Sequence, residues 1–451
     1  MALRRSVAAI AVALAAAVVG ISTPIAIAGT TVLVMGSTGY SLATPPDALS
    51  YVEEFVNATV DNYVSPASLK ASSGIPVGPY NRVAVITPEE AAPVSGTLTV
   101  DESVAQGVAA LHSCLTSTVC DYNGELGSVA PSTSDTFVVA GYSQSATIAM
   151  VEKACLAAEY AVGEGPVVSF LVTGDAKRPN GGLYARDPAG TLVSMLFAGG
   201  KSFAGAAPTN TQYATVDIAL QYDGWADFPL NPLNPLAVLN AYMGMLSIHS
   251  TYGDHSLDEP GVVDQGQYGD THYYLISTQT LPLLMPLKKL GPLGNALADT
   301  LDPALRVIVE SAYDRSISPG VPTAWNIFYV ENPIKFTKDF LRAIPVGLGN
   351  GIQDLAGYRP FGTQRPNLYG VGGPAVEYTT DESITAVSDS TPDTAAGAAA
   401  ANGAGSALDQ LTKQRPTTAK KTASPPKSAS SAGSGKSTHA GVGSSKRAKA
   451  S

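Results

Sequence analysis

A serine placed where a buried strand passes into a helix is the feature that most constrains this chain. Residues 136–140 form a continuous apolar run typical of a buried strand, and residues 146–158 have the apolar spacing of a helix. Between them lies Gly-Tyr-Ser-Gln-Ser, residues 141–145. A nucleophilic serine on such a turn needs small residues two positions away on either side, and Gly141 and Ser145 are small. We therefore predict that Ser143 is a nucleophile; the alternative is a serine that only caps an ordinary helix.

The same turn predicts two hydrogen-bond donors for an oxyanion. The backbone N–H of Gln144 follows the nucleophile at the start of a helix, where it can donate to a developing negative charge. A second donor is expected from the turn after an earlier strand. Residues 32–35 form such a strand and run into Gly-Ser-Thr-Gly, residues 36–39. This small-residue turn predicts Ser37 as the second donor, unless it is only an ordinary glycine turn.

A serine nucleophile needs a base, and the base needs an acid that orients it. In this type of fold both follow the serine, first the acid and then a histidine. His249 follows a helical run at residues 235–246 and is our preferred base. We expect His255 to be solvated in its loop and His272, at the start of a strand, to serve packing.

The acid is expected just beyond a strand end. Residues 215–220 form a strand that runs into a loop containing Asp223, Gly224, Asp227 and Pro229. We prefer Asp227 as the acid, with Asp223 as the alternative. Asp175 is a third candidate, but its loop resembles a structural turn held by Arg178.

Short strands alternate with helices along the chain, which indicates a mainly parallel sheet covered on both faces. With the serine turn, this pattern predicts an α/β-hydrolase fold. Proline-punctuated apolar helices at 281–290, 293–313 and 334–355 predict an added C-terminal helical layer or lid. The other expected strands lie at 31–35, 82–86, 167–172 and 273–277, and the other expected helices at 47–63 and 104–115.

The two ends of the chain differ from its middle. Residues 1–28 hold a basic pair, an apolar run and a small-residue site, which predicts an export signal; an uncleaved N-terminal anchor is the alternative. Residues 29–375 have the periodicity of a folded domain. Residues 376–451 are rich in Ala, Ser, Thr, Gly, Pro and Lys, and we predict a disordered, low-complexity, basic tail.

Composition excludes several functions. The formal net charge of −10 argues against binding nucleic acid. No C-x-x-C motif and no His/Cys cluster occurs, so we predict neither a metal site nor a cofactor. In an exported protein Cys114 and Cys120 are close enough in sequence to form a disulfide, which would leave Cys155 as a buried thiol.

Five motifs in this order resemble the PE-PPE domain, the serine-hydrolase domain of mycobacterial PE and PPE proteins. The resemblance covers residues 30–356. The chain departs from the family in lacking the N-terminal PE or PPE helical module, and is similar to stand-alone exported members, some of which are acyltransferases in trehalose glycolipid assembly. The motifs are GSTG at 36–39, GYSQS at 141–145, GDAKRPNGG at 174–182, QYDGWADFP at 221–229 and IHSTY at 248–252.

A more distant similarity to cutinases supports Ser37 and Gln144 as oxyanion donors. It also supports an acid and a histidine that are close in sequence, as Asp227 and His249 are. Together the resemblances imply transfer of an acyl group from a lipid or glycolipid ester through a Ser143 acyl-enzyme.

Several points of function stay open from the sequence. The acceptor is water in an esterase or lipase, or a sugar hydroxyl in an acyltransferase. The rival is a non-catalytic envelope protein that keeps the fold as a binding module. We expect a secreted or cell-envelope location, association with a membrane or envelope surface, and acyl-chain binding by residues 281–355.

Overall fold

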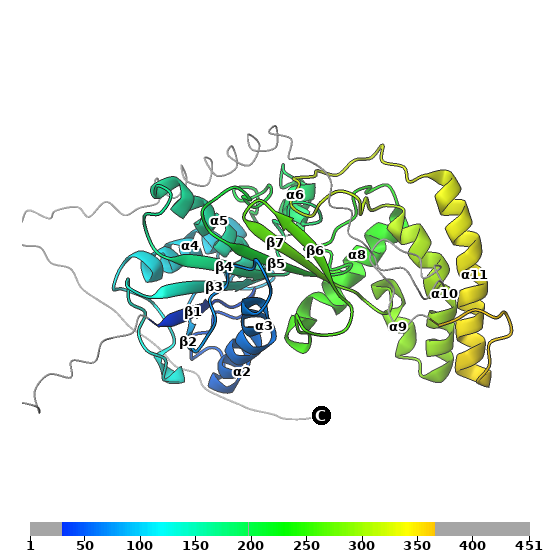
Figure 1. Ribbon diagram of the computed structural model, residues 1–451, viewed down its shortest axis with the longest axis horizontal. Helices are drawn as coiled ribbons and strands as arrows, with labels where there is room; N and C mark the ends of the chain where they lie inside the picture. The colour runs from blue at the N-terminus through cyan, green and yellow to red at the C-terminus, as the bar shows by residue number, and fades with distance from the viewer. Residues whose placement is uncertain (1–28, 197, 366–451) are drawn as a thin grey trace, which may run out of the picture. The chain divides into compact units, whose positions relative to one another are not determined.

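A seven-stranded sheet lies at the centre of the computed structural model (Figure 1). Its strand order is β2-β1-β3-β4-β5-β7-β6, and all neighbours are parallel except the antiparallel pair β6 and β7. The strands are β1 (Thr30–Val34), β2 (Tyr80–Ala84), β3 (Thr136–Tyr142), β4 (Val168–Thr173), β5 (Thr215–Leu220), β6 (Val262–Tyr268) and β7 (Thr271–Ile276).

The structure describes residues 29–196 and 198–365. They belong to one compact unit of the chain. The predicted signal or anchor at 1–28 and the predicted tail at 376–451 lie outside the described residues. None of the described helices is both long and apolar enough to span a bilayer.

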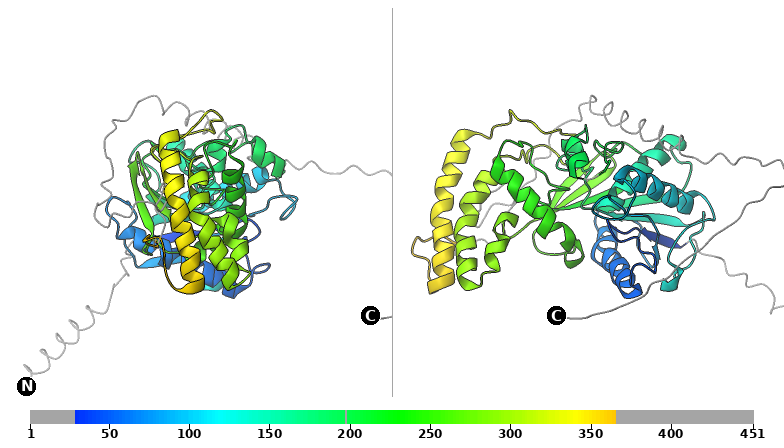
Figure 2. Two further views of the ribbon diagram at one scale, coloured as in Figure 1. Left: turned by 90° about the vertical axis from the view of Figure 1, so that its right-hand side faces the viewer. Right: turned by 180° about the vertical axis from the view of Figure 1, so that it is seen from behind.

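Two hydrophobic clusters cover the two faces of the sheet, because successive side chains of a strand point to opposite faces. Val32 and Val138 belong to one cluster, whereas their neighbours Leu33 and Phe137 belong to the other. The first face packs against α2 (Leu49–Thr59) and α8 (Pro235–Ser247), and the second against α4 (Val100–Thr116) and α5 (Gln144–Glu159) (Figure 2). A largely parallel sheet between helical layers confirms the predicted α/β-hydrolase fold.

The predicted C-terminal helical layer is also present. It consists of α9 (Met285–Lys288), α10 (Pro292–Glu310) and α11 (Pro333–Ala356), and lies beyond α8 (Figures 1 and 2). The helices α10 and α11 pack closely because glycines leave room between them: a Cβ on Gly347 would meet the Thr300 carbonyl oxygen at 2.0 Å, and one on Gly351 the Thr300 hydroxyl at 1.9 Å.

The sequence did not predict β6 or the shorter helices. The edge strand β6 is only half-buried and its pairing shifts between Asp264 and Gln267, so its side chains do not alternate between apolar and polar. The short segments lack enough residues to show a period. They are α3 (Ser65–Ser68), α6 (Leu183–Arg186), α7 (Thr191–Leu196) and 3₁₀ turns at Gly124–Leu126 and His249–Asp254. The expected helix at 47–63 ends in a π-helical turn at Val60–Val64, and the one expected at 281–290 begins as a 3₁₀ turn at Pro282–Leu284.

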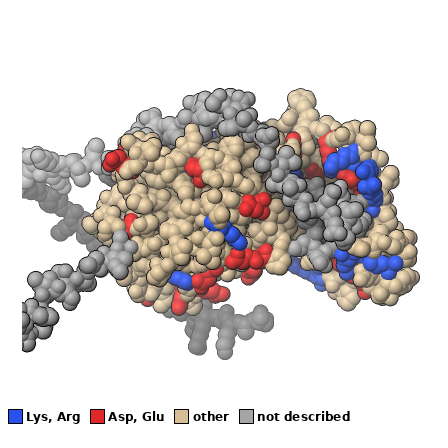
Figure 3. Space-filling view, in the orientation of Figure 1, with Lys and Arg blue, Asp and Glu red and all other residues tan. Residues whose placement is uncertain are grey.

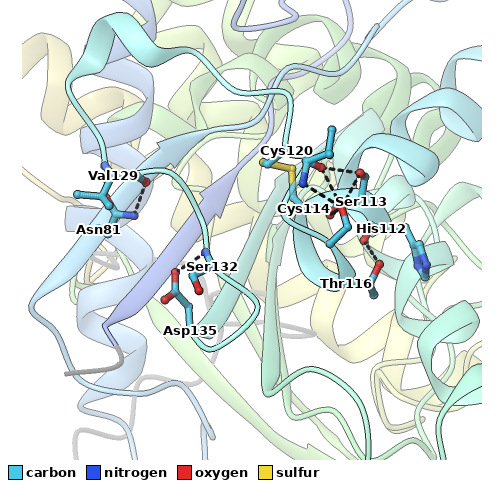
Figure 4. Close-up of a disulfide and its surroundings, with 11 residues drawn as sticks. Asn81, His112, Ser113, Cys114, Thr116, Cys120, Val129, Ser132 and Asp135 are labelled. Atoms are coloured by element: carbon cyan, nitrogen blue, oxygen red, sulfur yellow. Dashed lines mark hydrogen bonds between the residues drawn. A yellow bond between two sulfur atoms is a disulfide. The ribbon is translucent and has the colours of Figure 1, made fainter. Parts of the chain in front are cut away.

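Cys114 and Cys120 form a disulfide, as predicted (Figure 4). It joins the last turn of α4 to the loop that follows, with the two Cα atoms 4.2 Å apart. Cys155 is a free thiol buried on α5, and burial raises its pKa to about 12. At neutral pH it is therefore a protonated, inert side chain.

Candidate active site

Ser143 occupies the sharp turn between β3 and α5. Its backbone has φ +60° and ψ −115°, a conformation that is costly for any residue other than glycine. A Cβ on Gly141 would lie 2.5 Å from the carbonyl oxygen of Ser145, so only glycine fits at that position. The turn thus has the geometry of a nucleophile elbow, with the serine hydroxyl at the C-terminal edge of the sheet.

Ser145 is small enough for the turn and also forms hydrogen bonds that a glycine would lack. Its hydroxyl lies 2.5 Å from the Gly36 carbonyl oxygen and 2.8 Å from the Tyr142 backbone nitrogen, which donates to it. Ser145 is completely buried. A glycine could not make these bonds, which join the elbow to the loop after β1.

His249 lies beside Ser143. It begins the 3₁₀ turn that follows α8, and its Nε2 atom is 2.8 Å from the Ser143 hydroxyl. The Tyr142 hydroxyl donates to the His249 carbonyl oxygen. Gly174 lies against the imidazole, where an added Cβ would be 3.0 Å from Cε1. The structure therefore brings the predicted nucleophile and the predicted base together.

The acid beside His249 is Asp223, which corrects our preference for Asp227. Asp223 Oδ2 is 2.8 Å from His249 Nδ1 and accepts a second hydrogen bond from the Tyr252 hydroxyl at 2.9 Å. Asp223 Oδ1 accepts from the backbone N–H of Trp225. The carboxylate is completely buried and fully hydrogen-bonded, so it is held in one orientation.

Asp227 faces away from His249. Both of its carboxylate oxygens are bound by Arg315, at 2.6 and 3.0 Å, and Oδ2 also accepts from the Tyr222 backbone N–H. Arg315 bonds Glu310 as well, so Asp227 belongs to a buried ionic cluster behind the loop. The error arose because sequence spacing placed both aspartates just past β5 but did not show that an arginine 88 residues later takes one of them.

The remaining candidates lie elsewhere. His255 pairs with Glu259, and His272 on β7 pairs with Asp264 on β6. The Asp175 carboxylate accepts from the Lys177 backbone N–H, and the Asp175 carbonyl accepts from the Arg178 backbone N–H, whereas the Arg178 guanidinium bonds Asp217. Burial and the nearby Asp217 raise the pKa of Asp175 to about 7.

The two oxyanion donors predicted from the sequence lie on segments next to Ser143. Gln144 is the first residue of α5, and Ser37 pairs with Tyr40 in an isolated antiparallel bridge of the turn after β1. The loop of Ser37 is tight, because a Cβ on Gly36 would lie 1.8 Å from the Tyr40 carbonyl oxygen. Ser37 is nearly buried, and its neighbour Thr38 lines the pocket at Ser143. Ser37 and Gln144 therefore remain predicted oxyanion donors.

A segment after β2 holds both of these donors in place. The Glu89 carbonyl accepts from the Gly39 N–H at 2.7 Å, and the Glu90 carbonyl accepts from the Gln144 side-chain amide at 3.0 Å. The other end of that amide accepts from Ser103 on α4, also at 3.0 Å. The loop after β1 and the start of α5 are therefore tied to one common segment, which nothing in the sequence pattern indicated.

A pocket opens at Ser143. Its wall is mainly apolar, with Tyr184 and Trp225 as the largest side chains, and Trp225 lies 6.2 Å from the His249 ring. The expectation that residues 281–355 supply this wall is wrong, because none of them lines the pocket. Its other lining residues are Thr38, Ala91, Val100, Val104, Ser143, Gln144, Thr147, Gly174 and Ala176.

Comparisons with known proteins agree on one family. A family model described as the PE-PPE domain matches residues 78–314, a range that includes Ser143, Asp223 and His249 and ends before α11. The PE family protein PE3 of Mycobacterium tuberculosis is 35% identical over 312 residues, which are 67% of this chain and 59% of that protein. No solved structure matches the chain significantly.

Two relatives from the same organism have names that state an activity. Esterase PE16 is 36% identical over 334 residues, 72% of this chain and 55% of the esterase. SL1278 acyltransferase Chp1 is 32% identical over 196 residues, 42% of this chain and 46% of the acyltransferase. This chain spans about half the length of these relatives.

Proposed function

Because this chain belongs to the PE-PPE domain family, and Ser143, His249 and Asp223 are hydrogen-bonded in series, we propose that it is a serine esterase or acyltransferase. The observation that carries the proposal is this hydrogen-bonded series of three side chains, with the serine on a strained elbow. The names of the two relatives support the same class of reaction.

The proposed reaction has two halves. The Ser143 hydroxyl attacks the carbonyl carbon of an ester while His249 Nε2 takes its proton, and Asp223 stabilises the imidazolium. The N–H groups of Gln144 and Ser37 bind the oxyanion. The ester C–O bond then breaks, His249 protonates the leaving alcohol, and an acyl-Ser143 remains.

In the second half His249 removes a proton from the acceptor hydroxyl, whose oxygen attacks the acyl carbon. The bond between that carbon and Ser143 Oγ then breaks, and His249 returns the proton to Ser143. The acceptor is water in an esterase and a sugar hydroxyl in an acyltransferase. The apolar pocket suits an acyl chain, so we propose lipid or glycolipid esters as substrates. We further propose that the protein is exported, on the pattern of residues 1–28.

Covalent labelling tests the nucleophile. A fluorophosphonate probe should label the purified protein at Ser143, located by peptide mass spectrometry, and Ser143→Ala should abolish both labelling and ester turnover. Ser113→Ala, a half-buried serine on α4, is the matched control. A wild-type protein that resists the probe would favour the rival proposal of a non-catalytic envelope protein.

A second experiment separates the two enzyme classes. The protein is incubated with an acylated trehalose glycolipid, and the products are analysed by mass spectrometry. Free fatty acid would identify an esterase, whereas glycolipids with one acyl chain gained and one lost would identify an acyltransferase.

A further inference from the structure

The α10–α11 layer carries an unusually exposed apolar surface. On α10 the side chains of Leu293, Leu297 and Leu301 are 74, 48 and 38% exposed. On α11 a longer stripe has a member every seven residues, with one further member between the second and third, and extends about 32 Å at the rise of an α-helix. Its members are Ile334, Leu341, Ile344, Leu348 and Leu355, each at least 40% exposed.

The two stripes lie on the same side of the helix pair. On α10, Leu297 and Leu301 each come one residue after a position that contacts α11, namely Ala296 and Thr300. On α11, Leu348 likewise comes one residue after Gly347, which contacts α10. A step of one residue along an α-helix rotates the side-chain direction by about 100°, always in the same sense. The two helices run antiparallel. Equal rotations therefore bring both stripes to one face, which we call the hairpin face.

The segment that contains the hairpin face differs in charge from the rest of the domain. Residues 281–365 contain nine Lys or Arg residues and seven Asp or Glu residues. Residues 29–280 contain only seven Lys or Arg residues but twenty-four Asp or Glu residues. In the view of Figure 3 the basic side chains gather at the end formed by this layer.

Local pairing leaves some of these cations available. Lys335 pairs with Glu331 and Asp339, and Arg365 pairs with Asp299 and Asp354. Within the described part of the chain, no ion pair involves Lys289, Lys338 or Arg342.

We infer that the hairpin face binds an anionic lipid surface. Leucine and isoleucine on one face with lysine and arginine beside it are the features of helices that lie in a membrane interface. Lys338 and Arg342 flank Leu341 on α11, and long basic side chains can lay their stems along apolar surface while the charge reaches the lipid headgroups. A second copy is a poorer occupant, because it would bring the same unpaired cations together.

This inference goes beyond the proposed function. The helical layer does not line the pocket at Ser143, so it would attach the domain to a surface without taking part in catalysis. Its chemistry and the chemistry of Ser143 can therefore be tested separately.

A fluorescent probe at one position provides the first test. An environment-sensitive fluorophore is attached to Leu297→Cys in the full chain, with Val162→Cys as the control, since Val162 is 88% exposed on the loop after α5. The native thiol of Cys155 is buried and does not compete. The probe at 297 should shift to the blue with phosphatidylcholine vesicles containing phosphatidylglycerol, and the probe at 162 should not. Vesicle binding without a shift at 297 would overturn the inference, because another segment would then bind.

Substitutions provide the second test. Leu341→Glu with Leu348→Glu should weaken binding to these vesicles by about tenfold or more, while Val162→Glu should leave it unchanged. Turnover of a soluble ester and the melting temperature should stay at the wild-type values in both. Unchanged vesicle binding overturns the inference. Size-exclusion chromatography without lipid gives a second way to overturn it. If the wild type forms a concentration-dependent dimer that the double substitution abolishes, the face binds a second copy instead.

Discussion

Asp223 and Asp227 lie on one loop, four residues apart, and their carboxylates bind partners on opposite sides of it. Asp223 Oδ2 is 2.8 Å from His249 Nδ1, whereas Asp227 Oδ1 is 2.6 Å from Arg315 Nη1. The backbone N–H of Asp227 also donates to the Asp223 carbonyl oxygen. One turn therefore carries both the group that would orient the base and the group that anchors the turn to the ionic cluster behind it.

The two aspartates should separate activity from stability. Asp223→Asn should lower kcat/KM by about 10⁴, because asparagine presents the wrong group to His249 Nδ1. Asp227→Asn should retain most activity but destabilise the fold by about 1.5–3 kcal/mol, since Arg315 loses charge-assisted hydrogen bonds. Ester kinetics and urea unfolding of both variants check this. A larger loss of turnover in Asp227→Asn would return the acid to that position.

The side chain of Gln144 should act by holding its own backbone N–H in place. Gln144→Ala removes the bonds to Ser103 and to the Glu90 carbonyl, and we expect kcat to fall by about tenfold, less than the 10²–10³ lost when an oxyanion donor is removed entirely. The melting temperature and the rate of probe labelling at Ser143 show whether the elbow itself survives. Ser103→Ala breaks only one of the two bonds and should have a smaller effect in the same direction.

Chain-length preference should depend on the pocket wall and not on the helical layer. Val104 on α4 lines the pocket, so Val104→Phe should depress turnover of octanoyl esters and spare acetyl esters. Leu293→Phe, on the exposed side of α10, is the matched control and should change neither. Equal losses on both esters in Val104→Phe would point to misfolding and remove this wall from the acyl-chain site.

The sequence predicted what depends on short segments of the chain. The apolar run of β3, the small residues around Ser143 and the helix that follows are contiguous, so they predicted the elbow position without any long-range information. His249 was similarly marked by the end of α8. The parallel sheet followed from the alternation of strands and helices, and five of its strands (β1, β3, β4, β5 and β7) are buried along most of their length.

The sequence could not predict what distant residues decide. The choice between Asp223 and Asp227 depends on Arg315 and Tyr252, which reach this loop only in the folded chain. The leucines of α9 and α10 are as apolar as a pocket wall, yet α8 lies between this layer and the sheet, so the pocket is built from α4 and the loops near it. Apolar composition predicts burial or binding but not which neighbour supplies it.

The pH dependence of stability should reveal the buried carboxyl of Glu89. Burial raises its pKa from 4.5 to about 8, and a hydrogen bond from Thr87 offsets this only in part. The folded protein therefore holds a proton that the unfolded chain releases above pH 4.5. The resulting penalty is absent below pH 4.5, grows between pH 4.5 and 8, and is complete above pH 8.

Glu89→Gln removes this penalty, so its melting temperature relative to the wild type should rise as the pH increases from 4.5 to 8. Glu152 and Asp175 also have raised pKa values, but they are present in both proteins and cancel in the difference. Glu90→Gln is the neighbouring control with the opposite sign. Hydrogen bonds from the Leu98 and Thr97 N–H groups lower the pKa of Glu90, so its stabilising effect is lost as the pH falls. Thermal melts of the three proteins from below pH 4.5 up to pH 8 check both signs, because the effect of Glu90 changes only below pH 4.5 and that of Glu89 only above it. A pH-independent difference for Glu89→Gln would show that this carboxyl is ionised in the folded protein.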